Sequence, residues 1–272
     1  MKRARTYPEG VTSWIDVEQP DLAAARAFYS ELFGWSFADL GEDAAYVLAQ
    51  LDGQDVAGLA HGRDPQAVDW NTYIAVDDLD RAVSRVEAAS GRVTRPPTTA
   101  AAPGRMAACE DSQGVPFRLW EAGGRLGAQV TNAPGAWNFS DLHAADPGAS
   151  AAFYADVFGW QIDDVGFGAM IRQPGYGDHL AETVDPGIHE RQEQVQAPPG
   201  FADAIGWLVP SGVDETPQWH VTFAVADRDD TVAIVERLGG AVLTAEDTEW
   251  TRHAVVRDPQ GAAFTVSQFA PA

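Results

Sequence analysis

The chain has 272 residues, a length that suits about two domains, and hydrophobic residues make up 45% of it, enough for two cores. Acidic residues outnumber basic ones by 40 to 18, and the resulting net charge of −22 argues against nucleic-acid and anionic-membrane partners. No apolar run reaches membrane-spanning length and the N-terminus has no signal-peptide pattern, so a cytoplasmic protein is predicted. The single cysteine, Cys109, has no partner for an internal disulfide and is predicted to lie in the core.

The first elements of the chain are a strand, a helix and two further strands. Alternation at Trp14–Val17 predicts the strand, and Asp21 is a helix N-cap followed by apolar residues at helical spacing up to Gly34. Strands are then predicted at Tyr46–Leu51 and Val56–Ala60.

The same order follows once more before residue 125. Thr72–Val76 predicts a strand, and a helix is expected from about Asp78 to Ala89. Two strands, Met106–Glu110 and Pro116–Trp120, flank an Asp-Ser-Gln-Gly turn at 111–114 whose residues suit a hairpin.

The second half of the chain repeats the first. Phe28-Tyr29 and Phe33-Gly34-Trp35 recur as Phe153-Tyr154 and Phe158-Gly159-Trp160 at an offset of 125, whereas Trp70–Val76 matches Trp219–Val225 at an offset of 149. The 24 extra residues (149 − 125) therefore lie inside the second copy.

The insertion is placed at about 176–210. It is expected to contain a helix that starts at Pro186 behind an Asp185 cap, then a short stretch over Phe201–Trp207. It either caps the mouth of the second pocket or thickens the surface.

Taken in order, the Phe-Tyr pair, the Phe-Gly-Trp helix end, the Asp-Asp-Leu-Asp entry to the second helix and the Asp-Pro-Gln-Gly turn at 258–261 resemble the vicinal oxygen chelate superfamily, also called glyoxalase/bleomycin-resistance/dioxygenase. The resemblance covers about 11–125 and 135–270. It implies an α+β fold of four βαβββ modules in two glyoxalase/bleomycin-resistance-like domains, at 1–125 and 135–272, whose curved sheets enclose open pockets.

The resemblance also implies where members that use a metal place its ligands. The six corresponding positions carry mostly unsuitable side chains: Trp14, Asn71 and Arg118 in the first copy, and Phe139, His220 and Thr265 in the second. A catalytic divalent ion ordinarily has at least three protein ligands, and Arg118 would add a fixed positive charge. We therefore predict no metal and no other cofactor.

Strand alternation predicts that these residues share pocket faces with a few others. The expected ligand-binding residues are Trp14, Asp16, Asn71, Tyr73, Arg118, Trp120, Phe139, Asp141, His143, His220 and Thr265. Aromatic walls with sparse polar anchors are typical of small-molecule sites.

Several of these residues also have a purely structural explanation. Asp16 and Asp141 recur at one position and either accept ligand hydrogen bonds or form ion pairs with the equally recurrent Arg105 and Arg252, an alternative that we slightly favour. His220 is either a general base, working with Asp141 or His143, or a satisfied polar residue on a strand.

Two classes of function remain open from the sequence. The leading hypothesis is metal-independent binding of a small planar or aromatic molecule, such as a natural product, for sequestration, self-resistance or as an accessory to biosynthesis. The alternative is a superfamily enzyme, a lyase, isomerase or oxygenase, that uses His220 and Asp141 or an atypical metal site. The expected partner is a small-molecule ligand, and a homodimer is left open.

Overall fold

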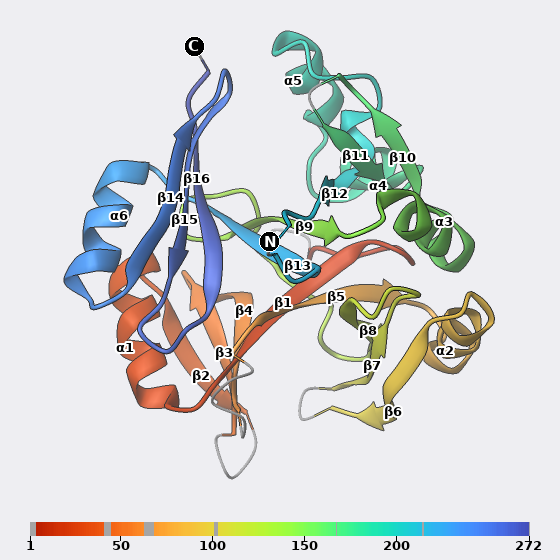
Figure 1. Ribbon diagram of the computed structural model, residues 1–272, viewed down its shortest axis with the longest axis horizontal. Helices are drawn as coiled ribbons and strands as arrows, with labels where there is room; N and C mark the ends of the chain where they lie inside the picture. Colours follow the sequence, from red (N-terminus) through yellow and green to blue (C-terminus); the bar gives the residue numbers. More distant parts are fainter. Residues whose placement is uncertain are drawn as a thin grey trace. The chain divides into compact units, whose positions relative to one another are not determined.

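The computed structural model describes residues 4–40, 45–62, 68–100, 103–166, 168–213 and 215–271, and within them four βαβββ modules follow one another (Figure 1). The first module has β1 (Thr12–Gln19), α1 (Leu22–Phe33), β2 (Ser36–Leu40), β3 (Tyr46–Leu51) and β4 (Gln54–His61). The second has β5 (Trp70–Val76), α2 (Leu79–Ala88), β6 (Arg92–Thr99), β7 (Gly104–Glu110) and β8 (Pro116–Ala122).

The second half repeats this order with one expansion. Its first module has β9 (Trp137–Ala144), α3 (Pro147–Phe158), β10 (Gln161–Asp164), β11 (Ala169–Arg172) and β12 (Ala204–Pro210). Between β11 and β12 lie α4 (Tyr176–Thr183), α5 (Ile188–Gln194) and the 3-10 turn η1 (Phe201–Asp203). The last module has β13 (Gln218–Ala224), α6 (Arg228–Arg237), β14 (Ala241–Asp247), β15 (Thr251–Arg257) and β16 (Ala263–Phe269). The predicted α+β fold of tandem βαβββ modules is confirmed.

The helix ends follow the predicted capping chemistry. The Asp21 side chain accepts a hydrogen bond from the Ala24 backbone N–H, and Asp146 does the same for Ala149. Both helices end at a glycine in the left-handed region, Gly34 with φ 72° and Gly159 with φ 75°, where a side chain would be strained. The duplication is thus visible in the local backbone as well as in the sequence.

The strands form two eight-stranded sheets, in the orders β2-β3-β4-β1-β5-β8-β7-β6 and β10-β11-β12-β9-β13-β16-β15-β14. Neither β2 nor β6 was predicted from the sequence, and these two strands and their equivalents β10 and β14 are the edge strands of the two sheets. They show little of the alternation between buried and exposed residues that marks a half-buried strand, and β6 carries two prolines, Pro96 and Pro97. Within the described residues, no helix is long and apolar enough to cross a membrane.

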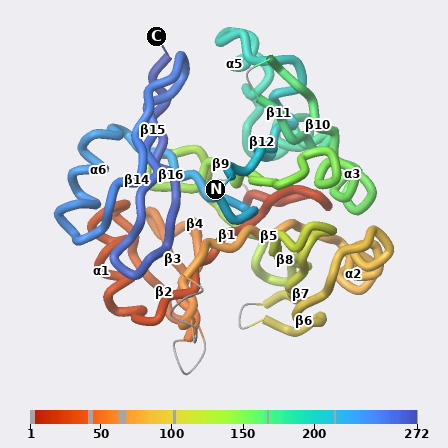
Figure 2. Tube along the Cα trace, viewed as in Figure 1, coloured from red at the N-terminus to blue at the C-terminus, as the bar shows by residue number. Residues whose placement is uncertain are grey.

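The chain folds into two compact units, and each draws on both halves of the sequence. Unit 1 comprises Met1–Ser13, Thr72–Gly127 and Ser140–Trp219; unit 2 comprises Trp14–Asn71, Ala128–Phe139 and His220–Ala272. In unit 2, α1 and α6 lie side by side although they come from opposite ends of the chain (Figure 2). In unit 1, α2 packs against α3 in the same way.

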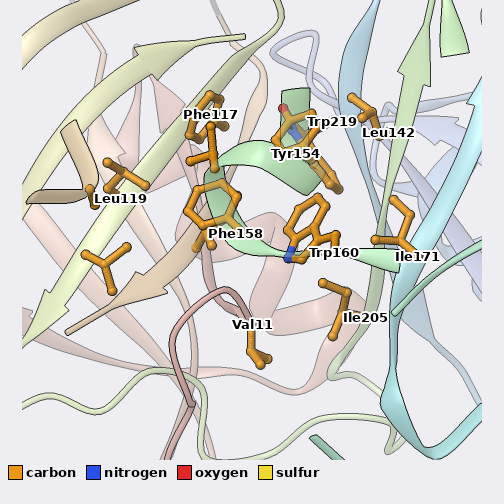
Figure 3. Packing of buried hydrophobic residues seen from close by; sticks show 14 of the residues in the cluster. Val11, Phe117, Leu119, Leu142, Tyr154, Phe158, Trp160, Ile171, Ile205 and Trp219 are labelled. Carbon is orange, nitrogen blue, oxygen red and sulfur yellow. Dashed lines mark hydrogen bonds between the residues drawn. The ribbon is translucent and has the colours of Figure 1, made fainter. Parts of the chain in front are cut away.

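Each unit has an aromatic core built from equivalent residues. In unit 1, Trp160 stacks on Tyr154 with ring centroids 4.7 Å apart, and Phe117 and Trp219 meet Tyr154 edge-on (Figure 3). In unit 2, Trp35 stacks on Tyr29 at 5.4 Å, with Trp70 edge-on. The Trp of each Phe-Gly-Trp helix end therefore belongs to one of these cores. Cys109 is buried in the core of unit 1, as predicted.

The recurrent Gln of the Asp-x-Gln-Gly turns ties each helix start to a strand turn from the other half of the chain. The Gln113 side chain accepts from the backbone N–H of Asp146 and donates to its carbonyl, at 2.8 and 3.0 Å. Gln260 makes the same pair of hydrogen bonds with Asp21, at 2.8 and 2.9 Å. The turn motif therefore fixes helix positions inside each unit.

Candidate functional site

In the first copy, the predicted site residue Asp16 is sealed inside unit 2. Its Oδ2 accepts a hydrogen bond from the Tyr46 hydroxyl at 3.1 Å, and its Oδ1 accepts one from Asn71 Nδ2 at 3.0 Å. Trp14 Nε1 donates to the same Tyr46 hydroxyl at 2.9 Å. Asp16 has no exposed surface. The structure brings the three predicted residues Trp14, Asp16 and Asn71 together with Tyr46, which sequence reasoning did not single out.

Three more predicted residues of the first copy meet in unit 1. Arg118 Nη1 donates to the Tyr73 hydroxyl at 2.8 Å, and the guanidinium carbon lies 5.4 Å from the Tyr73 ring centroid. Trp120 lies edge-on to Tyr73 at 6.5 Å and is buried. Trp120 also lines a cavity of about 170 Å³ together with Tyr7 and Leu126.

The equivalent strands of the second copy carry smaller side chains, in unit 2. Thr222, Thr265 and Ser267 take the positions of Tyr73, Arg118 and Trp120. His220 Nε2 and Thr265 Oγ1 are 2.8 Å apart and both residues are buried. Phe139, on β9, is half-buried.

Asp141, also on β9, is a half-buried polar residue of unit 1. Its Oδ1 accepts a hydrogen bond from the backbone N–H of Trp207 at 3.1 Å, and its Oδ2 makes no hydrogen bond to any residue that the structure describes. Trp207 on β12 is itself half-buried, and Phe201 of η1 lies 6.4 Å from it, ring centroid to ring centroid. We call Asp141, Trp207, Phe201 and Gly168 the Asp141 site.

Burial raises the pKa of Asp141 to about 7, opposed only by the hydrogen bond from the Trp207 backbone. The carboxyl group therefore changes charge near neutral pH. Two residues further along β9, His143 Nδ1 contacts Glu215 Oε1, so this predicted residue is held by a carboxylate. His220 belongs to unit 2 and Asp141 to unit 1, and their joint action stays a prediction.

The positions around the two recurrent aspartates differ by an exchange: where the first copy has an aromatic ring the second has a glycine, and where the first has a glycine the second has an aromatic ring. Gly58 is the register partner of Asp16, and a side chain there would collide with the Tyr46 hydroxyl. The parallel pairing of Leu142 with Leu208 places Trp207 at the position of Gly58, an offset of 149 (207 − 58). Leu48 pairs with Gly58 as Met170 pairs with Trp207.

Counting back two residues from Met170 puts Gly168 at the position of Tyr46, and a Cβ on Gly168 would lie 3.1 Å from the Trp207 ring. The ring thus comes from β3 in the first copy and from β12 in the second. Sequence reasoning missed both rings, although the offset of 149 applied to Gly58 leads directly to Trp207.

The side chains at the six superfamily metal positions do not fit a divalent ion. Trp14 and Phe139 offer no donor atom that binds a metal, and Arg118 places a cation there. Among the described residues there is also no cluster of three His, Cys, Asp or Glu side chains that could hold a metal.

The predicted ion pairs of the recurrent aspartates are wrong. Arg105 instead contacts Asp80 and Glu121, and Arg252 contacts Asp229 and Asp247. Arg105 is paired across the strands with Glu121, whose side chain also accepts from the first N–H of α2, so the arginine is drawn to the helix start.

The insertion differs in detail from its prediction. Its second helix begins at Ile188 behind Gly187 and not at Pro186, and the Asp185 side chain pairs with Arg191 and does not cap the helix. The helix α4 was not predicted. The insertion is fastened within unit 1 by the segment before β1: Arg5 donates to the Tyr176 hydroxyl at 2.8 Å, and the Thr6 hydroxyl lies 3.0 Å from His179 Nε2. Its last turn delivers Phe201 to the Asp141 site.

The fold consists of tandem βαβββ modules, and their strands carry the positions at which metal-dependent superfamily members place their ligands. These two features define a glyoxalase-like class of protein. Two family models match accordingly: the glyoxalase/bleomycin resistance protein/dioxygenase superfamily at residues 13–119 and a glyoxalase-like domain at 137–267. The chain belongs to this superfamily.

The relatives that match over nearly the whole chain include a mycobacterial and a Streptomyces protein. The chain is 33% identical to CFP32 of Mycobacterium tuberculosis, which is provisionally named a glyoxylase, over 100% of this chain and 99% of that protein. It is 32% identical to the anthracycline biosynthesis protein DnrV of Streptomyces peucetius, over 96% of this chain and 94% of that one.

A solved structure shares the fold. The Mn(II)-bound glyoxalase of Novosphingobium aromaticivorans superposes with a TM-score of 0.61 at 17% identity, over 96% of this chain and 83% of that one. At that identity the likeness concerns the fold alone.

Proposed function

We propose that this protein binds a small planar or aromatic molecule, such as a natural product, without a metal ion, and that the Asp141 site takes part in binding. The observation that carries the proposal is a half-buried indole, Trp207, beside a carboxyl group whose Oδ2 makes no hydrogen bond to the described residues. A planar ring gains dispersion and stacking energy on an indole, and a single polar anchor fixes its orientation.

The replaced metal positions support binding without metal coordination. Trp14, Phe139 and Arg118 stand where a metal-dependent member would need ligands, so an ion would lack the three protein ligands that a catalytic site ordinarily has. The relative DnrV, which carries anthracycline biosynthesis in its name, supports an aromatic natural product as the class of ligand. Sequestration, self-resistance and an accessory role in biosynthesis all use such binding. The other predicted ligand residues keep that role as predictions.

Titration of tryptophan fluorescence with a panel of planar aromatic polyketides is expected to give saturable quenching. Trp207→Phe should remove a large part of the quenching amplitude, because the quenched indole is the one against which the ligand lies. Trp250→Phe is the matched control: Trp250 is 39% exposed, lies in the β14–β15 turn and should leave the quenching unchanged.

Two results would contradict the proposal. One is a flat response across the whole panel. The other is stoichiometric iron, zinc or manganese in protein purified without chelators, measured by elemental analysis, since a bound ion would give the ligand another anchor.

A second candidate function is proton transfer by Asp141, because a carboxyl with a pKa of about 7 can both take and give a proton at neutral pH. Its ordinary pKa of 3.8 applies to the unfolded chain, so this group costs stability progressively as the pH rises from about 4 to 7, and the full cost remains above 7.

We therefore expect Asp141→Asn to stabilise the protein most above pH 7 and least near pH 4, measured by urea unfolding across this range. If the residue is a catalytic base, the same variant also abolishes turnover of whichever substrate is found. A stability difference that does not vary with pH would show that the carboxyl does not titrate near 7.

A further inference from the structure

The first copy of the repeat already holds a phenol against its aspartate. In unit 2 the Tyr46 ring crosses Gly58, where no side chain intervenes, and its hydroxyl donates to Asp16 Oδ2 at 3.1 Å. Asn71 donates to the other carboxylate oxygen at 3.0 Å. Both oxygens of Asp16 are therefore satisfied by the protein itself, and the residue is fully buried.

The second copy keeps the aspartate and loses the phenol. Gly168 stands at the Tyr46 position, and the Asn71 position belongs to His220 of the other unit. Asp141 Oδ1 accepts the Trp207 backbone N–H, which leaves Oδ2 as an acceptor with no hydrogen bond to the residues described. A half-buried carboxylate oxygen that lacks a protein donor is only partly solvated, so a ligand hydroxyl would supply the hydrogen bond that the protein does not.

The ring that replaces Tyr46 has different chemistry. Trp207 points its ring over Gly168 from the opposite strand, within 3.1 Å of the place where a Cβ on that glycine would lie. An indole presents a broad π face, but it has no hydroxyl to donate to Asp141. Trp207 therefore replaces the aromatic surface of the first copy and not its hydrogen bond.

We propose that Asp141 Oδ2 accepts a hydrogen bond from an aromatic hydroxyl group of the ligand, with the ligand ring against Trp207, in the way that Asp16 accepts the Tyr46 hydroxyl. This inference rests on the proposed function and specifies its ligand class: a hydroxyaryl compound. A ligand carboxylate is disfavoured at this position by repulsion from Asp141 and from Glu215 at the neighbouring His143.

Isothermal titration calorimetry at pH 7, where most of the ligand hydroxyl keeps its proton, with 2-hydroxyanthraquinone and 2-methoxyanthraquinone tests the inference, because methylation removes the donor and keeps the ring. We expect the hydroxy compound to bind at least about 10-fold more tightly, a difference of about 1.4 kcal/mol. Asp141→Ala should weaken the hydroxy compound to the level of the methoxy compound and leave the methoxy compound unchanged. Asp156→Ala, at an exposed position of α3 in the same unit, is the matched control and should change neither affinity.

A paired substitution tests the comparison between the copies. Gly168→Tyr together with Trp207→Gly rebuilds the arrangement of the first copy, so the new hydroxyl should occupy Asp141 and lower the affinity for 2-hydroxyanthraquinone at least about 10-fold. Circular dichroism establishes that this variant is folded; if it is not, the Asp141→Ala comparison decides alone.

The outcomes separate the two proposals. If neither compound binds the wild-type protein, the hydroxyaryl inference fails, and flat fluorescence across the wider panel would remove aromatic binding as well. If both compounds bind equally, or Asp141→Ala weakens both alike, aromatic binding stands and the hydroxyl contact is wrong. Tighter binding of 2-aminoanthraquinone than of the hydroxy compound would also overturn it, in favour of an amine donor.

Discussion

Asp258→Ala is expected to lower the free energy of unfolding by about 4 kcal/mol, because it leaves several buried donors without an acceptor. Asp258 is 4% exposed and lies in the turn before β16. Its Oδ2 accepts hydrogen bonds from Gln19 Nε2 and the Tyr29 hydroxyl, both at 2.8 Å. Its Oδ1 accepts the backbone N–H groups of the turn that it begins. One side chain thus joins β1, α1 and the turn inside unit 2.

Asp111→Ala is the matched control, because Asp111 begins the equivalent turn and is 3% exposed. Its Oδ1 also accepts turn N–H groups, from Gln113 and Val115, but its Oδ2 has no hydrogen-bond partner among the residues that the structure describes. Ala144 replaces Gln19 (19 + 125 = 144), and burial raises the pKa of Asp111.

We expect Asp111→Ala to cost about 2 kcal/mol, since only the turn contacts are lost. Urea unfolding at pH 7 measures both variants. Equal losses would show that the two hydrogen bonds to Asp258 Oδ2 contribute nothing.

The helices were predictable because single residues mark where each helix begins and ends. An aspartate that caps the first turn and a glycine that takes the left-handed conformation fix α1 between Asp21 and Gly34. The inner strands β3 and β5 were predictable for a different reason: most of their residues are apolar, and neither is an edge strand. The edge strands bury no continuous face, so hydrophobic alternation carries no signal for them.

The strand positions of the candidate site residues were predictable from the sequence, but the side chains that contact them were not. Alternation correctly placed Asp16 and Asp141 on strands. Which side chain contacts each carboxylate, however, depends on β3, β4, β11 and β12, and the sequence offset between equivalent residues of the two copies differs among these strands. Tyr46 maps to Gly168 at 122 (168 − 46) and Gly58 maps to Trp207 at 149, so no single offset aligns the pair. The prediction that Arg105 and Arg252 pair with these aspartates was wrong because both arginines pair with acidic residues at nearby helix starts.

Trp160→Ala is expected to lower the free energy of unfolding of unit 1 by about 4 kcal/mol, within the range for truncating a large buried aromatic residue. Trp160 is 3% exposed, stacks on Tyr154 with an interplanar angle of 10°, and donates from Nε1 to the Gly10 carbonyl at 2.7 Å. The loss therefore combines a cavity with a buried carbonyl that no longer has a donor.

The segments in which Trp160→Ala accelerates hydrogen exchange show whether the chain unfolds by its two compact units or by its two sequence halves. Unit 1 takes residues from both halves, so hydrogen exchange should accelerate in 72–127 and 140–219 together, while 14–71 and 220–271 change less. Trp35→Ala is the mirror control: Trp35 donates to the Gly135 carbonyl at 2.7 Å and should shift exchange in unit 2. If Trp160→Ala instead exposes the whole of 135–272 and spares 72–127, cooperativity follows the sequence halves. The hydrophobic core shared by α2 and α3 would then not be the unit of stability.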